Sequence, residues 1–307
     1  MDSTADMSGF SVRLRPYLAI ARHDLRSLWQ SKLIRLWLAA SVIVTLLLTL
    51  GNWTQLTSAP LIASIMFPYL VFPWFLVVIV LGVTPVSGLQ AETLADGVLS
   101  RPVTRHGFLL ATWASRVVTT LGVCYLVVIP ATAVIALAER PTPEDKVTLF
   151  GIMATLGIVG LVLTLLVSLG FFMGTLLRRP LLAVTVLIFV WYPINLVLSV
   201  FSLEQFSPIS LNQALTTQLR RPWRQVEASP ETELGQADAD AEAFARQASH
   251  FLDVLSGKRT GPQNSKQDFF EPGKFDDFSL AQVALGYAVP TLIVIGLAVL
   301  CFHRRDL

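Results

Sequence analysis

Charged side chains are scarce in this sequence, and the long apolar stretches almost entirely lack them. Only 14% of the 307 residues are charged, against about a quarter in a typical soluble domain. Crossing the hydrocarbon core of a bilayer takes a helix of roughly 17–25 apolar residues. Six stretches qualify, and only the first contains a charge, Arg35 at its edge: 34–50, 61–86, 117–138, 147–177, 181–203 and 280–302. The sequence therefore predicts an all-α integral membrane protein with six transmembrane helices.

The residues that usually carry catalysis or bind metals are also few and dispersed. The four histidines show no metal-ligand spacing, and both cysteines lie inside apolar stretches, where they are expected to be small buried residues. Residues 256–260 (SGKRT) lack the earlier glycine of a phosphate-binding loop. No carboxylate pair falls within a predicted span, which argues against a self-sufficient proton pump. We expect no catalytic, cofactor or metal residues in this chain, no nucleic-acid partner, and hence no enzyme activity of its own.

Basic residues are distributed unevenly between the two sides of the predicted membrane domain. If the N-terminus is cytoplasmic, thirteen of the 23 Lys and Arg residues but only six of the 21 Asp and Glu residues lie on the cytoplasmic side. Short cytoplasmic loops carry an excess of Lys and Arg. The sequence therefore predicts that both termini are cytoplasmic, in a multi-pass protein of the bacterial inner membrane.

A basic amphipathic segment precedes the first span. Apolar residues recur at helical spacing over 10–31, ending at Trp29, while most of the arginines, including Arg22 and Arg26, lie off that face. Arg15 belongs to the same basic set. Such a helix is expected to lie in the membrane interface with its arginines near anionic headgroups. The alternative is a solvated arm that only satisfies the positive-inside bias.

A cytoplasmic segment, 87–116, joins the second and third predicted spans. Its first part has a helical pattern, Pro102 is expected to break that helix, and Thr104 is a candidate N-cap for a helix that enters the third span. The alternative interpretation is a simple turn rich in basic residues. The candidate functional residues of this segment are Glu92, Asp96, Gly97, Arg101, Pro102 and Arg105.

The longest polar region, 204–279, lies between the fifth and sixth predicted spans. It is expected to be an extracytoplasmic insertion with an amphipathic helix at 229–257, which begins at a Ser-Pro-Glu sequence. The apolar face of that helix would pack within its own domain, against a second subunit or on an external partner. In the fifth span, Asn195 is a candidate for a translocation path, although polar residues in spans more often link helices.

The basic N-terminal helix, the six-span pattern and the Leu-Ser-Arg-Pro-Val-Thr-Arg element at 99–105 together resemble the ABC-2 type permeases of ABC transporters. The C-terminal Phe-His-Arg-Arg-Asp-Leu is similar to the usual ending of these chains. Two features depart from the family pattern: the interval from Gly97 to Pro102 is short, and a lysine often found after the element is missing. The long insertion is most similar to that of NosY-like permeases.

The resemblance implies a single transmembrane domain over 1–307 and a division of labour. A separate ATPase subunit would bind ATP and Mg²⁺, the 87–116 segment would be the coupling helix that docks on it, and the 10–31 helix would be the elbow. Members of the family work in pairs, so a second permease copy or a homologue is expected as a partner. The resulting hypothesis is a permease that moves a substrate across the membrane.

Two other functions stay open. The first is a mechanical or scaffolding subunit, whose ATPase acts on an extracytoplasmic protein held by 229–257 without moving any substrate. The second is a membrane enzyme that acts on lipid, which the missing catalytic groups disfavour.

Overall fold

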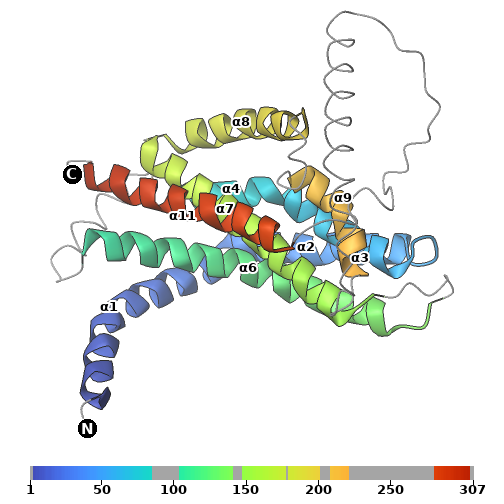
Figure 1. Ribbon diagram of the computed structural model, residues 1–307, viewed down its shortest axis with the longest axis horizontal. Helices are drawn as coiled ribbons and strands as arrows, with labels where there is room; N and C mark the ends of the chain where they lie inside the picture. Colours follow the sequence, from blue (N-terminus) through green and yellow to red (C-terminus); the bar gives the residue numbers. More distant parts are fainter. Residues whose placement is uncertain are drawn as a thin grey trace, which may run out of the picture.

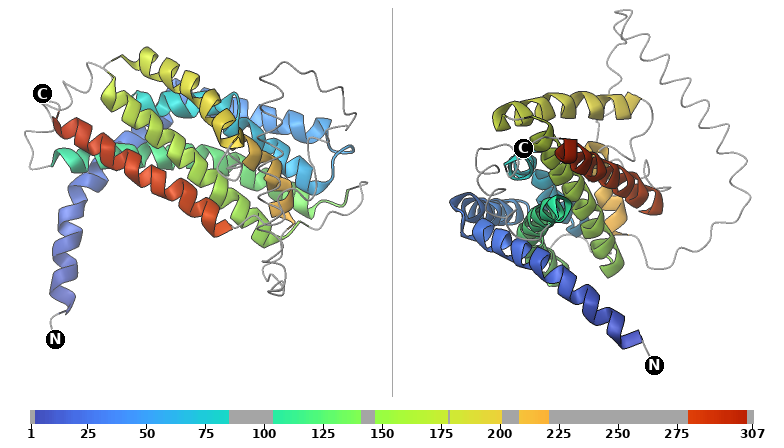
Figure 2. Two further views of the ribbon diagram at one scale, coloured as in Figure 1. Left: turned by 45° about the horizontal axis from the view of Figure 1, so that its top comes forward. Right: turned by 90° about the vertical axis from the view of Figure 1, so that its left-hand side faces the viewer.

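The computed structural model describes residues 3–84, 104–140, 147–177, 179–200, 208–220 and 280–304, and all regular elements in these ranges are helices. Helices α6, α7 and α11 run side by side, whereas the first half of α1 points away from the bundle (Figures 1 and 2). Helix α7 is central, because it packs against α4, α6, α9 and α11. The helices are α1 (Ser3–Gln30), α2 (Lys32–Gly51), α3 (Ser58–Leu70), α4 (Trp74–Val83), α6 (Arg105–Leu137), α7 (Leu149–Leu176), α8 (Pro180–Val200), α9 (Pro208–Leu219) and α11 (Leu280–Arg304).

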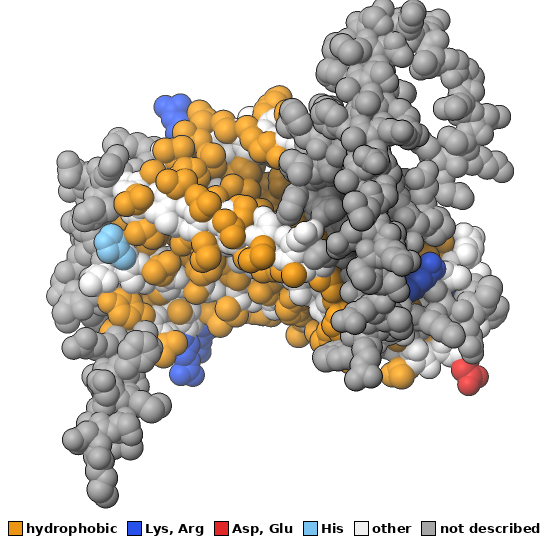
Figure 3. All heavy atoms as spheres, in the orientation of Figure 1, with side chains coloured by type: hydrophobic (Ala, Val, Ile, Leu, Met, Phe, Trp, Pro, Cys, Tyr) orange, Lys and Arg blue, Asp and Glu red, His pale blue; other side chains and the backbone are white. Residues whose placement is uncertain are grey.

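Five of the six predicted spans coincide with helices that are long and apolar enough to cross a membrane: α2, α3 together with α4, α6, α7 and α11. Large apolar side chains such as Leu36, Leu47 and Leu137 are exposed on these helices. The visible face of the described bundle is largely hydrophobic, with few charged side chains, which lie toward its margins (Figure 3). By length and composition the chain is thus an all-helical, multi-pass membrane protein.

The remaining predicted span, 181–203, overlaps α8. This helix starts at Pro180, where the missing proline N–H costs no hydrogen bond, only three residues after α7 ends at Leu176. It leads from the end of α7 back toward the other end of the bundle and is inclined to its neighbours (Figures 1 and 2). Its described apolar part, Pro180–Trp191, is shorter than a full span. The sixth span therefore stays a prediction.

The second span is divided between two helices. Helix α3 ends at Leu70 and α4 begins at Trp74, directly after Pro73. A proline lacks the N–H that an α-helix needs and collides with the preceding turn. Pro68 is accommodated within α3, and Pro130 within the continuous α6.

Helices α4 and α7 approach each other closely at three glycines. A Cβ atom at Gly82 would lie 2.7 Å from the Val167 carbonyl oxygen, and one at Gly170 would lie 2.8 Å from that of Ile79. Gly174 meets α4 in the same way, with 2.6 Å to the Val83 oxygen. Small residues at such contacts let the backbones approach, which is a main source of packing energy between helices in lipid.

The beginning of the expected insertion belongs to the bundle. Helix α9 packs against α3 and α7, and its residues Leu211, Ala214 and Leu215 are fully buried. Its last carbonyl is fixed as well, because the Thr148 N–H, at the start of α7, donates to the Leu219 oxygen at 3.0 Å. Residues 208–219 thus pack on the bundle, and Leu211, Ala214 and Leu215 belong to its main hydrophobic cluster. The insertion expected at 204–279 stays a prediction. The helix expected at 229–257 lies outside the described residues.

Candidate functional site

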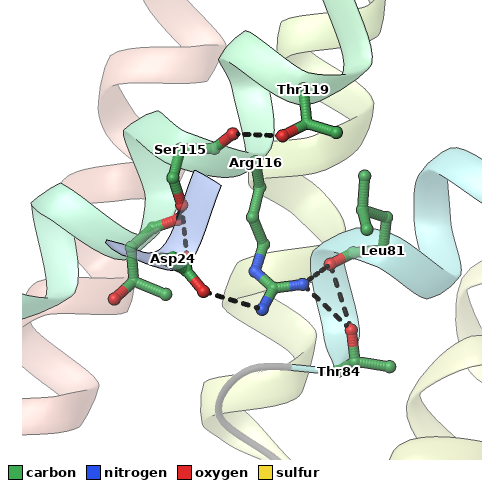
Figure 4. Close-up of polar contacts among 7 residues, drawn as sticks. Asp24, Leu81, Thr84, Ser115, Arg116 and Thr119 are labelled. Carbon is green, nitrogen blue, oxygen red and sulfur yellow. Dashed lines mark hydrogen bonds and ion pairs between the residues drawn. The ribbon is translucent and has the colours of Figure 1, made fainter. Parts of the chain in front are cut away.

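A buried arginine at the meeting point of three helices organises the most extensive polar cluster of the described chain. Arg116 lies within α6, and its side chain is only 9% exposed. Its Nη1 atom donates to the Leu81 carbonyl oxygen at 2.9 Å and to the Thr84 Oγ1 at 3.2 Å (Figure 4). Leu81 is in the last turn of α4, where helix carbonyls lack partners of their own. Arg116 therefore supplies the donor and the positive charge that favour the C-terminal end of α4.

Asp24, from α1, balances the charge of this arginine. Its Oδ1 atom lies 3.9 Å from the Arg116 Nη2, and the Ser115 hydroxyl donates to its Oδ2 (Figure 4). The Asp24 side chain is 24% exposed, so the pair sits at the edge of the bundle. A buried charge without a counter-charge is costly, and the partly exposed Asp24, 3.9 Å away, offsets part of that cost for Arg116. We refer to Asp24, Leu81, Thr84, Ser115 and Arg116 as the arginine junction.

A second contact joins α1 to the beginning of α6. The Tyr17 hydroxyl and the Thr104 Oγ1 are 3.1 Å apart and share a hydrogen bond. Thr104 is the N-cap of α6, accepting from the Gly107 N–H at 3.3 Å, which confirms the cap predicted from the sequence. The Tyr17 ring occupies the space where a side chain at residue 107 would lie, so a larger residue there would displace the ring.

Further along, Trp29 packs beside α6. A Cβ at Gly122 would be 3.3 Å from the Trp29 ring, and Leu28 is buried in the main hydrophobic core. The second half of α1 is therefore attached to α6 at three successive levels: at Thr104, at Ser115 and Arg116, and at Gly122.

Together these contacts connect α1 to both ends of residues 85–103. Thr84 directly precedes that stretch and is bonded to Arg116, which pairs with Asp24. Thr104 directly follows it and is bonded to Tyr17. Helix α1 is thus linked to both residues that flank 85–103, to Thr104 directly and to Thr84 through Arg116. A displacement of α1 relative to α6 would therefore change the contacts of both Thr84 and Thr104.

The structure describes only some of the residues that the sequence singled out. Arg22 and Arg26 are exposed on α1, Trp29 is partly buried, and Arg15 lies within α1. Arg105 is the first residue of α6, and Asn195 lies within α8. The other candidates of the cytoplasmic segment lie outside the described residues: Glu92, Asp96, Gly97, Arg101 and Pro102.

Two residues of the junction were not singled out from the sequence. Arg116, the last residue of the expected 87–116 segment, lies in the helix that the Thr104 cap predicted, but its burial against α4 was not foreseen. Asp24 was not singled out at all. The sequence could have pointed to it, since Asp24 is the one acidic residue between Arg13 and Lys32. An isolated carboxylate in a basic helix is a candidate partner for a buried cation.

At the opposite end of the bundle, another arginine has a structural role. Arg140 follows α6, and its Nη2 donates to the carbonyl oxygens of Trp53 and Leu56 in the loop between α2 and α3. Its guanidinium group lies over the Trp53 ring, 4.9 Å from the centroid. Arg140 therefore holds the loop between α2 and α3 against the end of α6.

No protein-family model matches the chain, and no curated protein matches its sequence.

Proposed function

We propose that the chain is the transmembrane subunit of an ABC transporter of the ABC-2 type. It would cross the bacterial inner membrane six times with both termini in the cytoplasm, and would couple ATP hydrolysis by a separate ATPase subunit to the movement of a substrate. The proposal rests on the sequence resemblance at 99–105 and on the attachment of α1 to both ends of 85–103.

The attachment of α1 is the observation that carries the proposal. A segment that is moved by a cytoplasmic ATPase can move the spans only if both of its ends are firmly attached to them. Flexible ends would absorb the motion. Thr84 and Thr104, which flank 85–103, are each tied to α1, directly or through Arg116. The two helices that continue from these points, α4 and α6, are part of the bundle core. This is the arrangement expected of a segment that transmits force.

The arrangement of the chain ends supports the proposed topology. The end of α4, the start of α6, the end of α7 and the end of α11 all lie toward the same end of the bundle (Figures 1 and 2). This end would face the cytoplasm because the basic residue Arg179 lies between α7 and α8 there.

In this mechanism the chain contributes positioning and motion, and no bond chemistry. The ATPase subunit would supply ATP and Mg²⁺, and its docking on 87–116 would shift the bundle between two states. A ligand or nucleotide shifts such an equilibrium only by its differential affinity for the two states. A second permease copy would complete the transporter, and Asn195 of α8 is the proposed contact for a substrate.

Copurification followed by charge reversal tests this function. The full-length protein, extracted in mild detergent, is expected to bring an ATPase subunit with it. Replacing Arg101 and Arg105 with Glu is expected to reduce the ATPase activity of the complex about tenfold or more, because like charges would face the docking surface. Membrane insertion should be unchanged. The matched control is Arg220→Glu, an exposed arginine after α9, which should retain full activity.

Absence of any associated ATPase would remove the basis of the proposal. Full activity of the Arg101→Glu, Arg105→Glu variant would instead contradict the assignment of 87–116 as the docking segment, while leaving the ATPase association intact.

The mechanical function is the second candidate, and the burial of α9 favours it. Helix α9 anchors the start of 221–279 directly to α7 through the Thr148–Leu219 bond, so a motion of α7 would reach an external partner. Deleting 229–257 separates the two functions. Retained substrate transport by the deletion variant supports the permease, whereas retained ATPase activity with loss of an external binding protein supports the mechanical subunit.

A further inference from the structure

The corner between α1 and α2 presents an exposed group of basic side chains. Arg22 and Arg26 lie one turn apart on α1, and Lys32 and Arg35 lie in the first turn of α2, all four exposed. We call these four residues the basic corner. Ser31, the single residue between the two helices, caps α2 by accepting from the Ile34 N–H at 3.3 Å, which fixes the direction in which the helices meet.

The basic corner has no carboxylate partner within the described part of the chain. Asp24, the nearest carboxylate in the sequence, points away to Ser115 and Arg116. Asp24 forms its ion pair with Arg116 instead. Within the described residues, the arginine junction therefore leaves the four exposed cations of the basic corner without this carboxylate.

Apolar side chains adjoin these charges. Leu18 on α1 and Leu33 and Leu36 on α2 are exposed, and Leu36 is 73% exposed. Helix α2 is itself long and apolar enough to span a membrane. Of the four cations, Arg35 also donates from Nε to the Trp29 carbonyl oxygen at 3.4 Å, and its charge stays exposed. Exposed leucines and exposed Lys and Arg side chains next to a helix long enough to span a membrane match the chemistry of the bilayer interface.

We propose that the basic corner binds the headgroups of anionic phospholipids, and that α1 transmits the presence of these lipids to both ends of 85–103. The second part rests on the proposed function of that segment, whereas the lipid binding does not. Charge complementarity selects the ligand, because four exposed cations at the start of a membrane-spanning helix are attracted to a negatively charged leaflet and much less to a zwitterionic one. Each Lys or Arg at such a surface strengthens binding by roughly fivefold.

The contacts of α1 give the route by which lipid binding reaches the segment. Headgroups that hold Arg22 and Arg26 would fix α1 in the membrane surface. Asp24, on the same helix, then keeps Arg116 in place against Thr84, and Tyr17 holds Thr104. Zwitterionic lipids would leave α1 free to move away from α6. The contacts at Thr84 and at Thr104 would then weaken together.

A label on α1 tests the lipid binding directly. Leu18→Cys places a nitroxide on an exposed position, in a background with Cys301→Ser, and the remaining Cys124 is fully buried. The full-length protein is reconstituted into vesicles of phosphatidylcholine alone or mixed with phosphatidylglycerol. We expect phosphatidylglycerol to deepen the label and to slow trypsin cleavage at Arg101 several-fold. Salt at 1 M should abolish the effect, because it shortens the screening length to about 3 Å.

Charge-neutral and charge-conserving variants identify the residues responsible. Arg22→Gln with Arg26→Gln should weaken the response to phosphatidylglycerol by roughly tenfold or more. Arg22→Lys with Arg26→Lys should keep it. The matched control replaces Arg178 and Arg179 with Gln, which removes two charges at the α7–α8 connection and should leave the response unchanged.

Each result decides between named outcomes. Equal label depth in the two vesicle types, or an unchanged response in the Arg22→Gln, Arg26→Gln variant, overturns the lipid assignment. Loss of ATPase copurification in that variant, with unchanged label depth, also overturns it and assigns the basic corner to an acidic protein surface. If the label responds but no ATPase is ever found, the lipid site stands and the proposed function of 85–103 fails.

Discussion

At the scale of single residues, Arg116 performs two tasks with one guanidinium group. It caps the C-terminal turn of α4 through Leu81 and Thr84, and it pairs with Asp24 of α1. The distances differ: 2.9 Å to the Leu81 oxygen but 3.9 Å to the Asp24 carboxylate. The attachment to α4 is thus the tighter one, and the attachment to α1 is the one that opens more easily.

Replacing Arg116 with Met should destabilise the protein more than any change at Asp24. It removes the Arg116 bonds to the Leu81 carbonyl and to Thr84 and the ion pair with Asp24, which should lower the free energy of unfolding by roughly 2–3 kcal/mol. Asp24→Asn keeps an acceptor for Ser115 and should cost about 1 kcal/mol. Unfolding in mixed detergent micelles measures both. Arg26→Met, an exposed arginine of α1, is the control, and an equal loss in that variant would argue against a special role for Arg116.

Residue-level prediction from the sequence succeeded where the signal was local. Thr104 was recognised as a cap because a hydroxyl three residues before a glycine N–H at a helix start is a short-range pattern. The Asp24–Arg116 pair escaped prediction because its members are far apart in the chain and meet only once α1 has folded along α6. Hydropathy alone also placed Arg116 outside the span, since it counts a charge as an end of the apolar run.

At the scale of helices, the contact between α4 and α7 depends on the absence of side chains. Gly82, Gly170 and Gly174 place backbone against backbone, and a methyl group at Gly170 would lie 2.8 Å from the Ile79 oxygen. The number and course of most helices followed from apolar length, because that length is fixed by the bilayer. Which helices pack against each other could not be predicted in this way, because the uniformly apolar surface of a helix in lipid does not indicate its partners.

Gly170→Ala should separate α4 from α7 and lower the free energy of unfolding by roughly 1–3 kcal/mol, the cost typical of overpacking. Gly157→Ala, on the same helix, is the matched control, because a Cβ there meets nothing within 4 Å. It should be neutral or stabilising by up to about 1 kcal/mol, since alanine favours the helix. Thermal unfolding in detergent compares the two variants. If both behave alike, the close approach of α4 and α7 is not important for stability.

At the scale of the whole molecule, the proposed topology assigns each end of the bundle to one side of the membrane. In cells with a Cys301→Ser background, a membrane-impermeant maleimide should label Gly51→Cys from outside and leave Arg179→Cys unlabelled until the cells are opened. Gly257→Cys should behave like Gly51→Cys, because α8 would carry the chain across once more. Labelling of Gly257→Cys only in opened cells would limit the chain to five spans, and the reverse pattern at Gly51 and Arg179 would invert the orientation.

The core position of α9 also has a consequence for biosynthesis. Helices α3 and α7 must be in place before α9 reaches them, since all three share buried contacts and Leu219 is bonded to the first turn of α7. Because Leu211, Ala214 and Leu215 are buried only after docking, a newly made chain exposes them until α9 reaches α3 and α7. A ribosome stalled before residue 208 would therefore leave the surfaces of α3 and α7 that bind α9 uncovered, and α11, which is made later, can complete its contacts with α7 only afterwards.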